Sequence, residues 1–410
     1  MTFNMGVIIT SAKYHNALAA IRCLGKHGIK VACGEDKRAE TSFFPMGFYS
    51  KYCSKRFVYP PYYEDPEGFI KHIINFANKN REYDVLMPID AETVIISKYK
   101  EVIEEEASHL KIPVHDYKYI SMANNKKETI KLANEIGIPT PKTYTPESID
   151  EVKDIADDIS YPAVIKLPIT KGSKGLSYVH DKEELIRMYK ETVNRFSSFP
   201  LIQEYIPGIG YGVSCLFNLG EPKAIFTHKR RREASVSGGP SVARISVRHE
   251  EMERYAVKIL KRLNWHGVAM VEFKLDVRDN KPKLMEINPR FWGSLYQAIA
   301  SGVEFPYLLY KIATEGDVEP VLSYKLGVET RYILGDIYAF PDYMLRSDNK
   351  IDFLKDFFNI KGESFDDLSF KDPVPFVAAL ASAAIRFIKT HHFGERDEID
   401  LDKIHVVCAI

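Results

Sequence analysis

Residues 267–294 read GVAMVEFKLDVRDNKPKLMEINPRFWGS, a stretch in which two strand-like segments flank a turn. Residues 268–277 are mostly apolar and β-branched, and charges enter at every second position, which is typical of a strand. The turn-forming sequence RDNKP follows, and residues 283–288 read as a second strand. The stretch therefore predicts a β-hairpin.

The hairpin carries two glutamates, Glu272 and Glu286, with Asp279 midway between them. An antiparallel hairpin centred there would set the two carboxylates side by side. Opposed carboxylates repel, so one takes up a proton or a cation lies between them. Asn288 shares a face with Glu286, and Mg²⁺ completes such a sparse oxygen site with water and substrate phosphates. Arg290 follows as a planar cation suited to phosphate or carboxylate. A solvated acidic hairpin is the alternative for either glutamate alone.

The whole pattern, E-(x13)-E-I-N-P-R, resembles the metal-binding hairpin of the ATP-grasp enzymes, the superfamily of biotin carboxylase, carbamoyl phosphate synthase and D-alanine–D-alanine ligase. The resemblance implies that Glu272, Glu286 and Asn288 bind the Mg²⁺ ions of ATP, with Mn²⁺ as an alternative metal. It also implies that Arg290 contacts the transferred phosphate or the substrate carboxylate.

The composition is that of a soluble globular protein, with 45% hydrophobic and 27% charged residues. A chain of 410 residues suggests two to three domains. Lys+Arg and Asp+Glu both number 56, so nothing calls for nucleic acid or an anionic membrane as a partner. The five cysteines form no C-x-x-C pair, which favours a reducing cytoplasm over a zinc or disulfide framework. Neither a signal peptide nor a membrane span is expected.

The first residues alternate strand, helix and strand over positions 6–33, which predicts a parallel sheet. No G-x-G-x-x-G follows the first strand, which counts against a dinucleotide site. Asp90 and Glu92 follow a third strand at residues 84–88, at a carboxyl end where ligands of open α/β sheets gather. They are candidates for substrate contact, and a helix cap at Asp90 is the alternative.

Two lysines are candidates for binding phosphate. Residues 124–136 predict a helix, and the resemblance implies that a lysine at its start reaches the ATP phosphates. Lys126 and Lys127 are adjacent candidates, and Lys126 is the one chosen. The alternative is that this lysine lies on the helix surface and binds nothing. Lys166 lies in an apolar strand, where a charge is costly unless it is paired. The resemblance assigns Lys166 to the α- and β-phosphates.

A glycine-rich loop follows that strand and reads PITKGSKGLS at residues 168–177. Flexible backbone donors beside lysines can wrap a polyphosphate. The resemblance assigns Gly172, Ser173 and Gly175 to a phosphate lid.

Residues 201–206, LIQEYI, resemble the interdomain hinge whose backbone reads the adenine edge. Many relatives place an acidic residue about four positions after the hinge aliphatic residue to hold the ribose, and this chain has Gly210 and then Tyr211 there. Tyr211 is therefore the candidate for ribose contact. The hinge residues implied by the resemblance are Gln203, Glu204, Tyr205 and Ile206.

Residues 228–233, HKRRRE, are either an anion site or a solvated strand edge. As a strand they would place His228, Arg230 and Arg232 on one face, and Arg230 is a catalytic candidate. Residues 235–244 resemble a carbamoyl phosphate synthase segment in position and glycine content, but Ser237 and Pro240 replace its His and Asp, which disfavours carbamoyl phosphate as the product. Arg244 is a candidate carboxylate clamp.

The expected fold is α/β (α+β) with ATP-grasp architecture. A Rossmann-like N-terminal domain is expected over residues 1–120, a lid region over 121–205, a central antiparallel-sheet domain over 206–325 and a mostly helical C-terminal extension over 326–410. ATP would lie between the lid and the central sheet. Residues 375–388 read as a packing or oligomer helix, compatible with a homodimer, and membrane-surface contact is a minority alternative.

The implied chemistry is a ligase reaction between small molecules. Mg-ATP would activate a carboxylate as an acylphosphate, and an amine or amino acid would then attack to give an amide, ADP and phosphate. A carboxylase or carbamoyl phosphate synthase-like enzyme is one alternative, and a non-catalytic ATP-binding module is the other.

Overall fold

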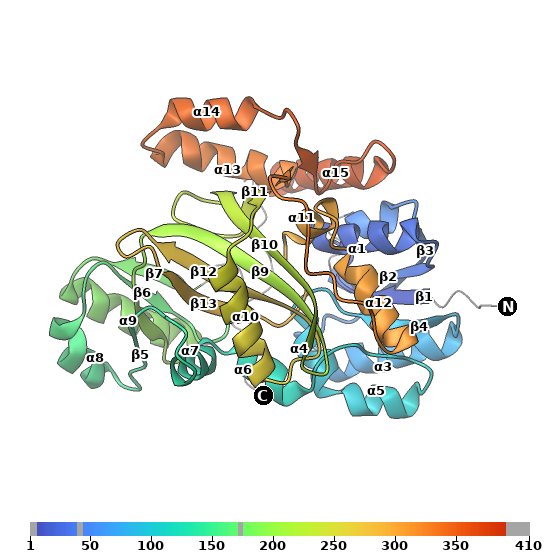
Figure 1. The fold of residues 1–410 in the computed structure, drawn as a ribbon, viewed down its shortest axis with the longest axis horizontal. Helices are drawn as coiled ribbons and strands as arrows, with labels where there is room; N and C mark the ends of the chain where they lie inside the picture. Colours follow the sequence, from blue (N-terminus) through green and yellow to red (C-terminus); the bar gives the residue numbers. More distant parts are fainter. Residues whose placement is uncertain (1–5, 39–43, 171–174, 391–410) are drawn as a thin grey trace.

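The computed structural model describes residues 6–38, 44–170 and 175–390. Its N-terminal part is a four-stranded parallel sheet, as the strand–helix–strand pattern predicts (Figure 1). The strands are β1 (Gly6–Ile9), β2 (Val31–Asp36), β3 (Cys53–Tyr59) and β4 (Tyr83–Met87), in the order β3-β2-β1-β4. Their order reverses between β1 and β4, so the carboxyl ends of these two strands border the crevice in which such sheets bind ligands. The accompanying helices are α1 (His15–Lys26), η1 (Met46–Tyr49), α3 (Pro66–Lys79), α4 (Glu92–Lys98), α5 (Lys100–Glu106), α6 (Tyr117–Asn124) and α7 (Lys126–Glu135).

A second, smaller sheet follows. It comprises β5 (Thr143–Tyr144), β6 (Ala163–Lys166), β7 (Leu176–Val179) and β8 (Leu201–Glu204), in the order β5-β8-β6-β7 and antiparallel throughout. The helices α8 (Ile149–Ile155), η2 (Ala156–Asp158) and α9 (Lys182–Phe196) belong to the same region. A separate small core holds α8 and α9 against the sheet, so this unit is packed on itself rather than merged with the larger cores.

The third sheet has seven strands and forms the centre of the molecule (Figure 1). Its strands are β9 (Gly208–Asn218), β10 (Glu221–Glu233), β11 (Ser241–Ser246), β12 (Gly267–Asp276), β13 (Pro282–Asn288), β14 (Glu329–Arg331) and β15 (Ser364–Phe365). The order is β13-β12-β9-β10-β11-β14-β15, and all pairs except β14–β15 are antiparallel. The helices α10 (Glu250–Arg262), α11 (Leu295–Ala300) and α12 (Phe305–Glu315) flank it.

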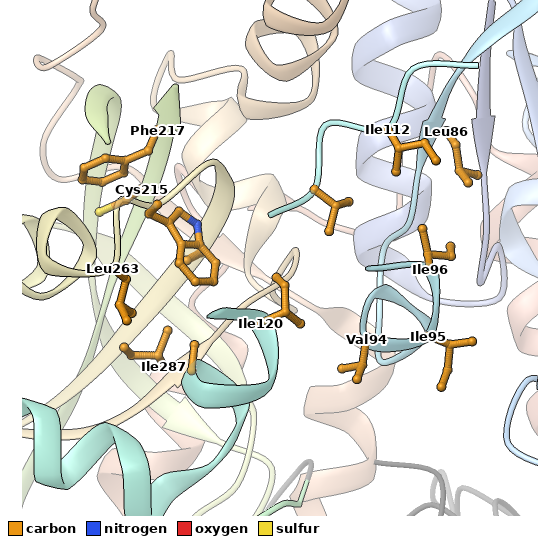
Figure 2. Packing of buried hydrophobic residues seen from close by; sticks show 14 of the residues in the cluster. Leu86, Val94, Ile95, Ile96, Ile112, Ile120, Cys215, Phe217, Leu263 and Ile287 are labelled. Carbon is orange, nitrogen blue, oxygen red and sulfur yellow. The ribbon is translucent and has the colours of Figure 1, made fainter. Parts of the chain in front are cut away.

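Two large apolar cores join the central sheet to the N-terminal sheet. In Figure 2, Leu86 and Ile96 of the N-terminal part lie in the same cluster as Phe217 and Ile287 of the central sheet, with Ile120 of α6 between them. A second cluster packs α1 against α11 and α12. Because these cores are continuous across both units, the carboxyl ends of the N-terminal strands are held beside the hairpin.

The C-terminal extension adds both helices and strands. Beyond β14 the chain forms α13 (Ile333–Arg346), α14 (Lys350–Phe358), β15 and α15 (Val374–Thr390), so the helix predicted at residues 375–388 is present. The extension also reaches the N-terminal unit, where Arg22 of α1 donates to the Asp372 carboxylate at 2.9 Å and to three backbone carbonyls. In the part of the chain that the structure describes, no helix combines the length and apolarity needed to cross a bilayer.

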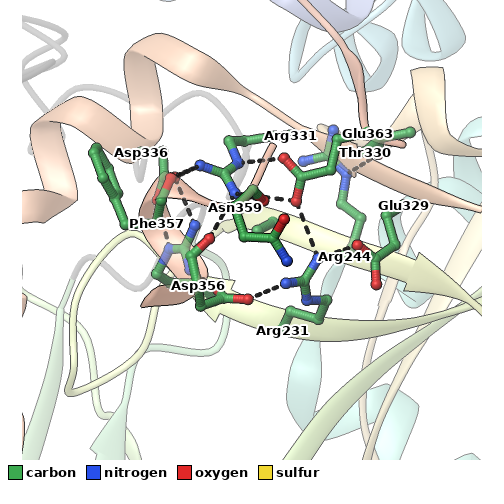
Figure 3. A network of polar contacts seen from close by, with 12 residues as sticks. Arg231, Arg244, Glu329, Thr330, Arg331, Asp336, Asp356, Phe357, Asn359 and Glu363 are labelled. Carbon is green, nitrogen blue, oxygen red and sulfur yellow. Dashed lines mark hydrogen bonds and ion pairs between the residues drawn. The ribbon is translucent and has the colours of Figure 1, made fainter. Parts of the chain in front are cut away.

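The basic run of β10 explains how the extension is attached. The pairing of β10 with β11 is irregular between Arg230 and Arg232, which leaves Arg231 as an extra residue. The simple alternation expected from the sequence is therefore wrong, and Arg231 and Arg232 both pair with Asp356 at the end of α14 (Figure 3). Arg232 also forms a bidentate ion pair with Asp336, in which its Nε and Nη2 each lie 2.6 Å from a carboxylate oxygen. These cations anchor the extension and are not free to bind substrate.

Candidate active site

The hairpin places the paired carboxylates as predicted. The β12–β13 register sets Glu272 opposite Glu286 and Met270 opposite Asn288. The Asn288 Nδ2 donates to Glu272 Oε1 at 3.0 Å and to Glu286 Oε1 at 3.3 Å. The three side chains thus form one cluster of oxygen-bearing groups.

Cations flank both carboxylates. Arg230 pairs with Glu272, and the Lys126 Nζ lies 3.2 Å from Glu286 Oε2. Burial raises the pKa of Glu272 and outweighs the opposing effect of Arg230. Burial acts in the same direction on Glu286, but the nearby charges of Lys126 and Lys166 lower its pKa overall. The two neighbouring lysines therefore favour the charged form of Glu286.

The donor set suits Mg²⁺ bound together with phosphates. Among the described residues, no group of three or more His, Cys, Asp or Glu side chains is arranged to hold a metal. Two carboxylates and an amide are too few for a complete protein cage, but Mg²⁺ commonly uses one or two carboxylates and takes its other ligands from water and substrate phosphates. The residues present fit that second kind of site.

Glycines in β9 explain how Arg230 reaches the hairpin, because β9 lies between β10 and β12. A Cβ at Gly210 would lie 2.8 Å from the Arg230 Cδ, and one at Gly212 would lie 2.4 Å from the His228 Cε1. Side chains at these two positions would therefore collide with the β10 side chains that cross β9. The alternating glycines of residues 208–212 are the sequence signal for this crossing.

The two phosphate-binding candidates face the same site. Lys126 is the first residue of α7, its N–H donates to the Pro168 carbonyl at 2.9 Å, and its Nζ lies 3.3 Å from the Thr170 Oγ1. Lys166 ends β6 and donates to the Gln203 Oε1 at 2.7 Å. Both ammonium groups are mostly buried, and both lie near Glu286. The structure therefore gathers cations where a polyphosphate would need them.

A cavity of about 710 Å³ lies between the small sheet and the central sheet. Hinge residues Glu204, Tyr205 and Ile206 border one side, and the Lys274 Nζ donates to the Ile206 carbonyl at 3.0 Å. Gln203 differs from them, since it is buried and holds Lys166 and the Thr143 hydroxyl rather than facing the cavity. The cavity also reaches Lys126, Lys166, Arg230, Glu272 and Glu286.

Tyr211 and Arg244 are predicted site residues that, like Gln203, Asn288 and Arg290, do not line this cavity. Tyr211 alternates with Gly210 and Gly212 along β9, so its ring points to the opposite face of the sheet and packs edge-on against His249. The suggestion that Tyr211 contacts ribose is therefore wrong. Arg244 is fully buried, pairs with Asp366 and donates to the Thr330 hydroxyl at 3.1 Å. It ties β11 to the C-terminal extension and does not clamp a substrate.

The glycine loop lies only partly within the described residues. Gly172 and Ser173 are outside them. Gly175 precedes β7 with a φ of 65°, a conformation that favours glycine, and a Cβ there would lie 2.5 Å from the Leu167 Cδ1. Gly175 therefore allows the backbone conformation with which the chain turns into β7.

Arg290 connects the hairpin to the N-terminal sheet. Its Nη2 donates to the Asn288 Oδ1 at 3.2 Å, and its Nη1 lies 3.5 Å from the Asp90 Oδ1. Asp90 is thus next to the hairpin and is not the N-cap of α4, since Ala91 occupies that position. Glu92 is fully buried, and its Oε1 accepts from the Thr10 hydroxyl at 2.6 Å. Of these two carboxylates, Asp90 is the one beside the cations of the site.

Comparison with known protein families agrees with this geometry. Residues 196–334 match the family described as ATP-grasp in the biosynthetic pathway with Ter operon, and residues 125–207 match the carbamoyl-phosphate synthase L chain, ATP binding domain. A D-alanine–D-alanine ligase from Carboxydothermus hydrogenoformans is 31% identical over 219 residues, which are 48% of this chain and 70% of that protein.

The carbamoyl phosphate synthase large chain of Pyrococcus furiosus is 26% identical over 223 residues, which are 52% of this chain. The chain covers only 20% of that protein's length, and 42% and 21% of two further carbamoyl phosphate synthase chains.

Solved structures share the fold at low sequence identity. Biotin carboxylase from Campylobacter jejuni superposes with a TM-score of 0.64 and 18% identity, covering 80% of this chain and 75% of that one. An L-amino acid ligase from Bacillus licheniformis superposes with a TM-score of 0.58 and 18% identity, covering 78% of each chain.

The fold is that of a nucleotide-dependent class of enzymes, and the candidate phosphate-binding groups lie between a small sheet and a large antiparallel sheet. The chain belongs to the ATP-grasp superfamily. Enzymes of this superfamily use ATP and Mg²⁺.

Proposed function

We propose that the protein is a Mg-ATP-dependent ligase that joins a carboxylate to an amine or amino acid, forming an amide with release of ADP and phosphate. The observation that supports this most is the meeting of Glu272 and Glu286 with Lys126, Lys166 and Arg230 around one cavity. Such a site provides hard oxygen ligands and a surplus of phosphate-binding cations, and no nucleophilic side chain is needed for the reaction.

The division of labour follows from the chemistry. A free carboxylate is a poor electrophile because its leaving group would be oxide, whereas phosphate leaves far more readily from an acylphosphate. Glu272, Glu286 and Asn288 would hold Mg²⁺, which when bound neutralises charge on the phosphates. Lys126 and Lys166 would bind the phosphates through their ammonium groups. The protein would act mainly by positioning and charge neutralisation.

The carboxylate substrate would bind between Arg290 and the carboxyl ends of β1 and β4. Arg290 has its guanidinium beside Asp90, so one side of this subsite is cationic and the other anionic. That polarity suits a carboxylate and an amine presented together. We also propose the division of the chain into N-terminal, lid, central and C-terminal regions at residues 120, 205 and 325, with substrates between the first and third.

ADP release with Mg-ATP tests this proposal. The protein is incubated with a panel of amino acids and small carboxylates, singly and in pairs. We expect release that requires one particular carboxylate together with one particular amine, and mass spectrometry of the mixture should show the amide. Release with bicarbonate alone would favour a carboxylase instead, a reading that the similarity to biotin carboxylase supports. Nucleotide binding without any turnover across a broad panel would point to a binding module.

A pH prediction follows from Lys166. Burial lowers its pKa to about 8; Lys126 and Lys274 act in the same direction, whereas Glu286 and Glu272 oppose the shift. The ammonium is therefore mostly charged at pH 7 and mostly neutral at pH 9. Since phosphate binding needs the charge, we expect the affinity for Mg-ADP to fall about tenfold between these two pH values. Isothermal titration calorimetry measures this directly.

The conservative variant Lys166→Arg is the control for that experiment. A guanidinium stays protonated throughout the range, so the variant should lose most of the pH dependence even if its affinity is lower. An unchanged affinity of the native protein from pH 7 to pH 9 would contradict the assignment of Lys166 to the phosphates.

A further inference from the structure

Gly210 occupies the position where many ATP-grasp relatives carry an acidic residue, and Tyr211 points away from the cavity. We infer that Glu233, at the end of β10, supplies the carboxylate that binds the ribose hydroxyls of the nucleotide. This inference rests on the proposed use of ATP and identifies a residue for a subsite to which Gly210 contributes no side chain.

The ribose subsite can be located from the two ends of the nucleotide. The sugar joins the base to the phosphates, so it must lie between the hinge at residues 204–206 and the pair Glu272–Glu286. Lys274 lies two residues after Glu272 on the same face of β12, and its Nζ donates to the Ile206 carbonyl of the hinge at 3.0 Å. The β9 partner of Lys274 is Gly210. The paired residues Gly210 and Lys274 therefore lie between the positions expected for the base and for the phosphates of the nucleotide.

Glu233 fills the space beside Gly210. A Cβ built at Gly210 would lie 3.3 Å from the Glu233 Oε1, so the carboxylate lies next to where a side chain at position 210 would begin. Glu233 lines the cavity, and its side chain is 22% exposed. A carboxylate from β10 thus occupies the region into which a side chain at position 210 of β9 would project.

The orientation of Glu233 is held from two directions. The Arg230 Nη1 donates to Oε1 at 2.9 Å, and the Tyr343 hydroxyl of α13 accepts the Glu233 backbone N–H at 3.2 Å. Within the described residues, Oε2 accepts no hydrogen bond. An ionised carboxylate can accept about four hydrogen bonds, so Glu233 retains capacity for both hydroxyls of a sugar diol. Because Tyr343 belongs to the C-terminal extension, that extension acts here as a positioning element.

The alternative is that Glu233 serves only as a counter-ion for Arg230. The two roles differ in their dependence on the sugar. A counter-ion would affect the binding of every nucleotide equally, through Arg230, whereas a ribose ligand distinguishes nucleotides that differ only in their hydroxyls.

The test measures the affinity of the full chain for Mg-ADP, Mg-2′-deoxy-ADP and Mg-3′-deoxy-ADP by isothermal titration calorimetry. We expect the native protein to bind each deoxynucleotide about tenfold more weakly than ADP, as for the loss of a hydrogen bond to a charged group. Glu233→Ala should bind all three with similar affinity, below that of the native protein for either deoxynucleotide, because it loses the hydrogen bonds to both hydroxyls. Glu233→Gln keeps the shape of the side chain and should discriminate between ADP and the deoxynucleotides less than the native protein does. It provides a second test of the inference if the alanine variant does not fold.

Glu221→Ala is the matched control, since Glu221 lies at the other end of β10 and is 71% exposed. It should leave all three affinities unchanged. Equal weakening of the three nucleotides in Glu233→Ala, or no discrimination by the native protein, would overturn the inference while leaving ATP use intact. Failure of the native protein to bind any of the three would instead overturn the proposed function, and this inference with it.

Discussion

Replacing Glu286 by glutamine is expected to abolish Mg²⁺-dependent ADP formation and to leave the fold intact. Glu286 faces Glu272 across the hairpin, and the charges of Lys126 and Lys166 favour its ionised form. Glutamine keeps the shape and loses the charge that would hold Mg²⁺. Since a catalytic metal contributes several kcal/mol of charge stabilisation, we expect kcat to fall about a thousandfold or more. Steady-state ADP release, measured over a range of Mg²⁺ concentrations, checks this.

Circular dichroism shows whether the variant is folded. Removing one of two opposed carboxylates relieves repulsion but also removes the ion-pair partner of Lys126, and because these two effects oppose each other the variant should still be folded. Glu221→Gln makes the same chemical change at an exposed position of the same sheet and should retain native activity. Native turnover by Glu286→Gln would show that the hairpin is not the metal site.

Removing the carboxylate of Asp366 is expected to have the largest effect on stability. Asp366 and Arg244 form an ion pair in which both side chains have 0% exposure. In Asp366→Ala the Arg244 guanidinium remains buried and keeps only neutral partners, the Thr330 hydroxyl and the Ser241 carbonyl. Leaving one member of a buried pair uncompensated costs about 3–5 kcal/mol. Urea denaturation followed by circular dichroism should show this loss, beginning with the C-terminal extension.

Asp317→Ala is the control, because its ion pair with Lys223 is on the surface and its carboxylate side chain is 58% exposed. That variant should lose no more than about 1 kcal/mol. The double variant Arg244→Met/Asp366→Leu replaces both charges with apolar groups and should be more stable than Asp366→Ala alone. Equal stability of Asp366→Ala and Asp317→Ala would contradict the structural role given to the Arg244–Asp366 pair.

The ion pairs of Arg231 and Arg232 have a consequence for the active site. They hold the end of β10, and with it Arg230 and Glu233, against α13 and α14. Figure 3 shows Arg231 paired with Asp356 of α14. The extension is far from the hairpin in sequence, but it determines where the last residues of β10 lie. Changes in the extension should therefore alter nucleotide affinity as well as stability.

Sequence patterns alone were enough to predict the hairpin and the pairing of its two glutamates. The partners Glu272 and Glu286 are joined by a short turn, so turn residues and strand alternation were enough to predict their pairing. The same holds for the parallel N-terminal sheet and for the helix start at Lys126, because helix ends and strand alternation are local signals.

The tertiary structure decided which of the other charged residues belong to the site. Arg230 reaches Glu272 only because β9 lies between their strands and carries glycine at the crossing point. Arg244, one strand further away, instead meets Asp366, which is more than a hundred residues distant in sequence. Both arginines looked equally suitable for substrate in the sequence, since strand order and the irregular pairing at Arg231 depend on contacts between distant segments. Periodicity reports which face a side chain occupies, whereas the packing of the whole sheet decides what that face meets.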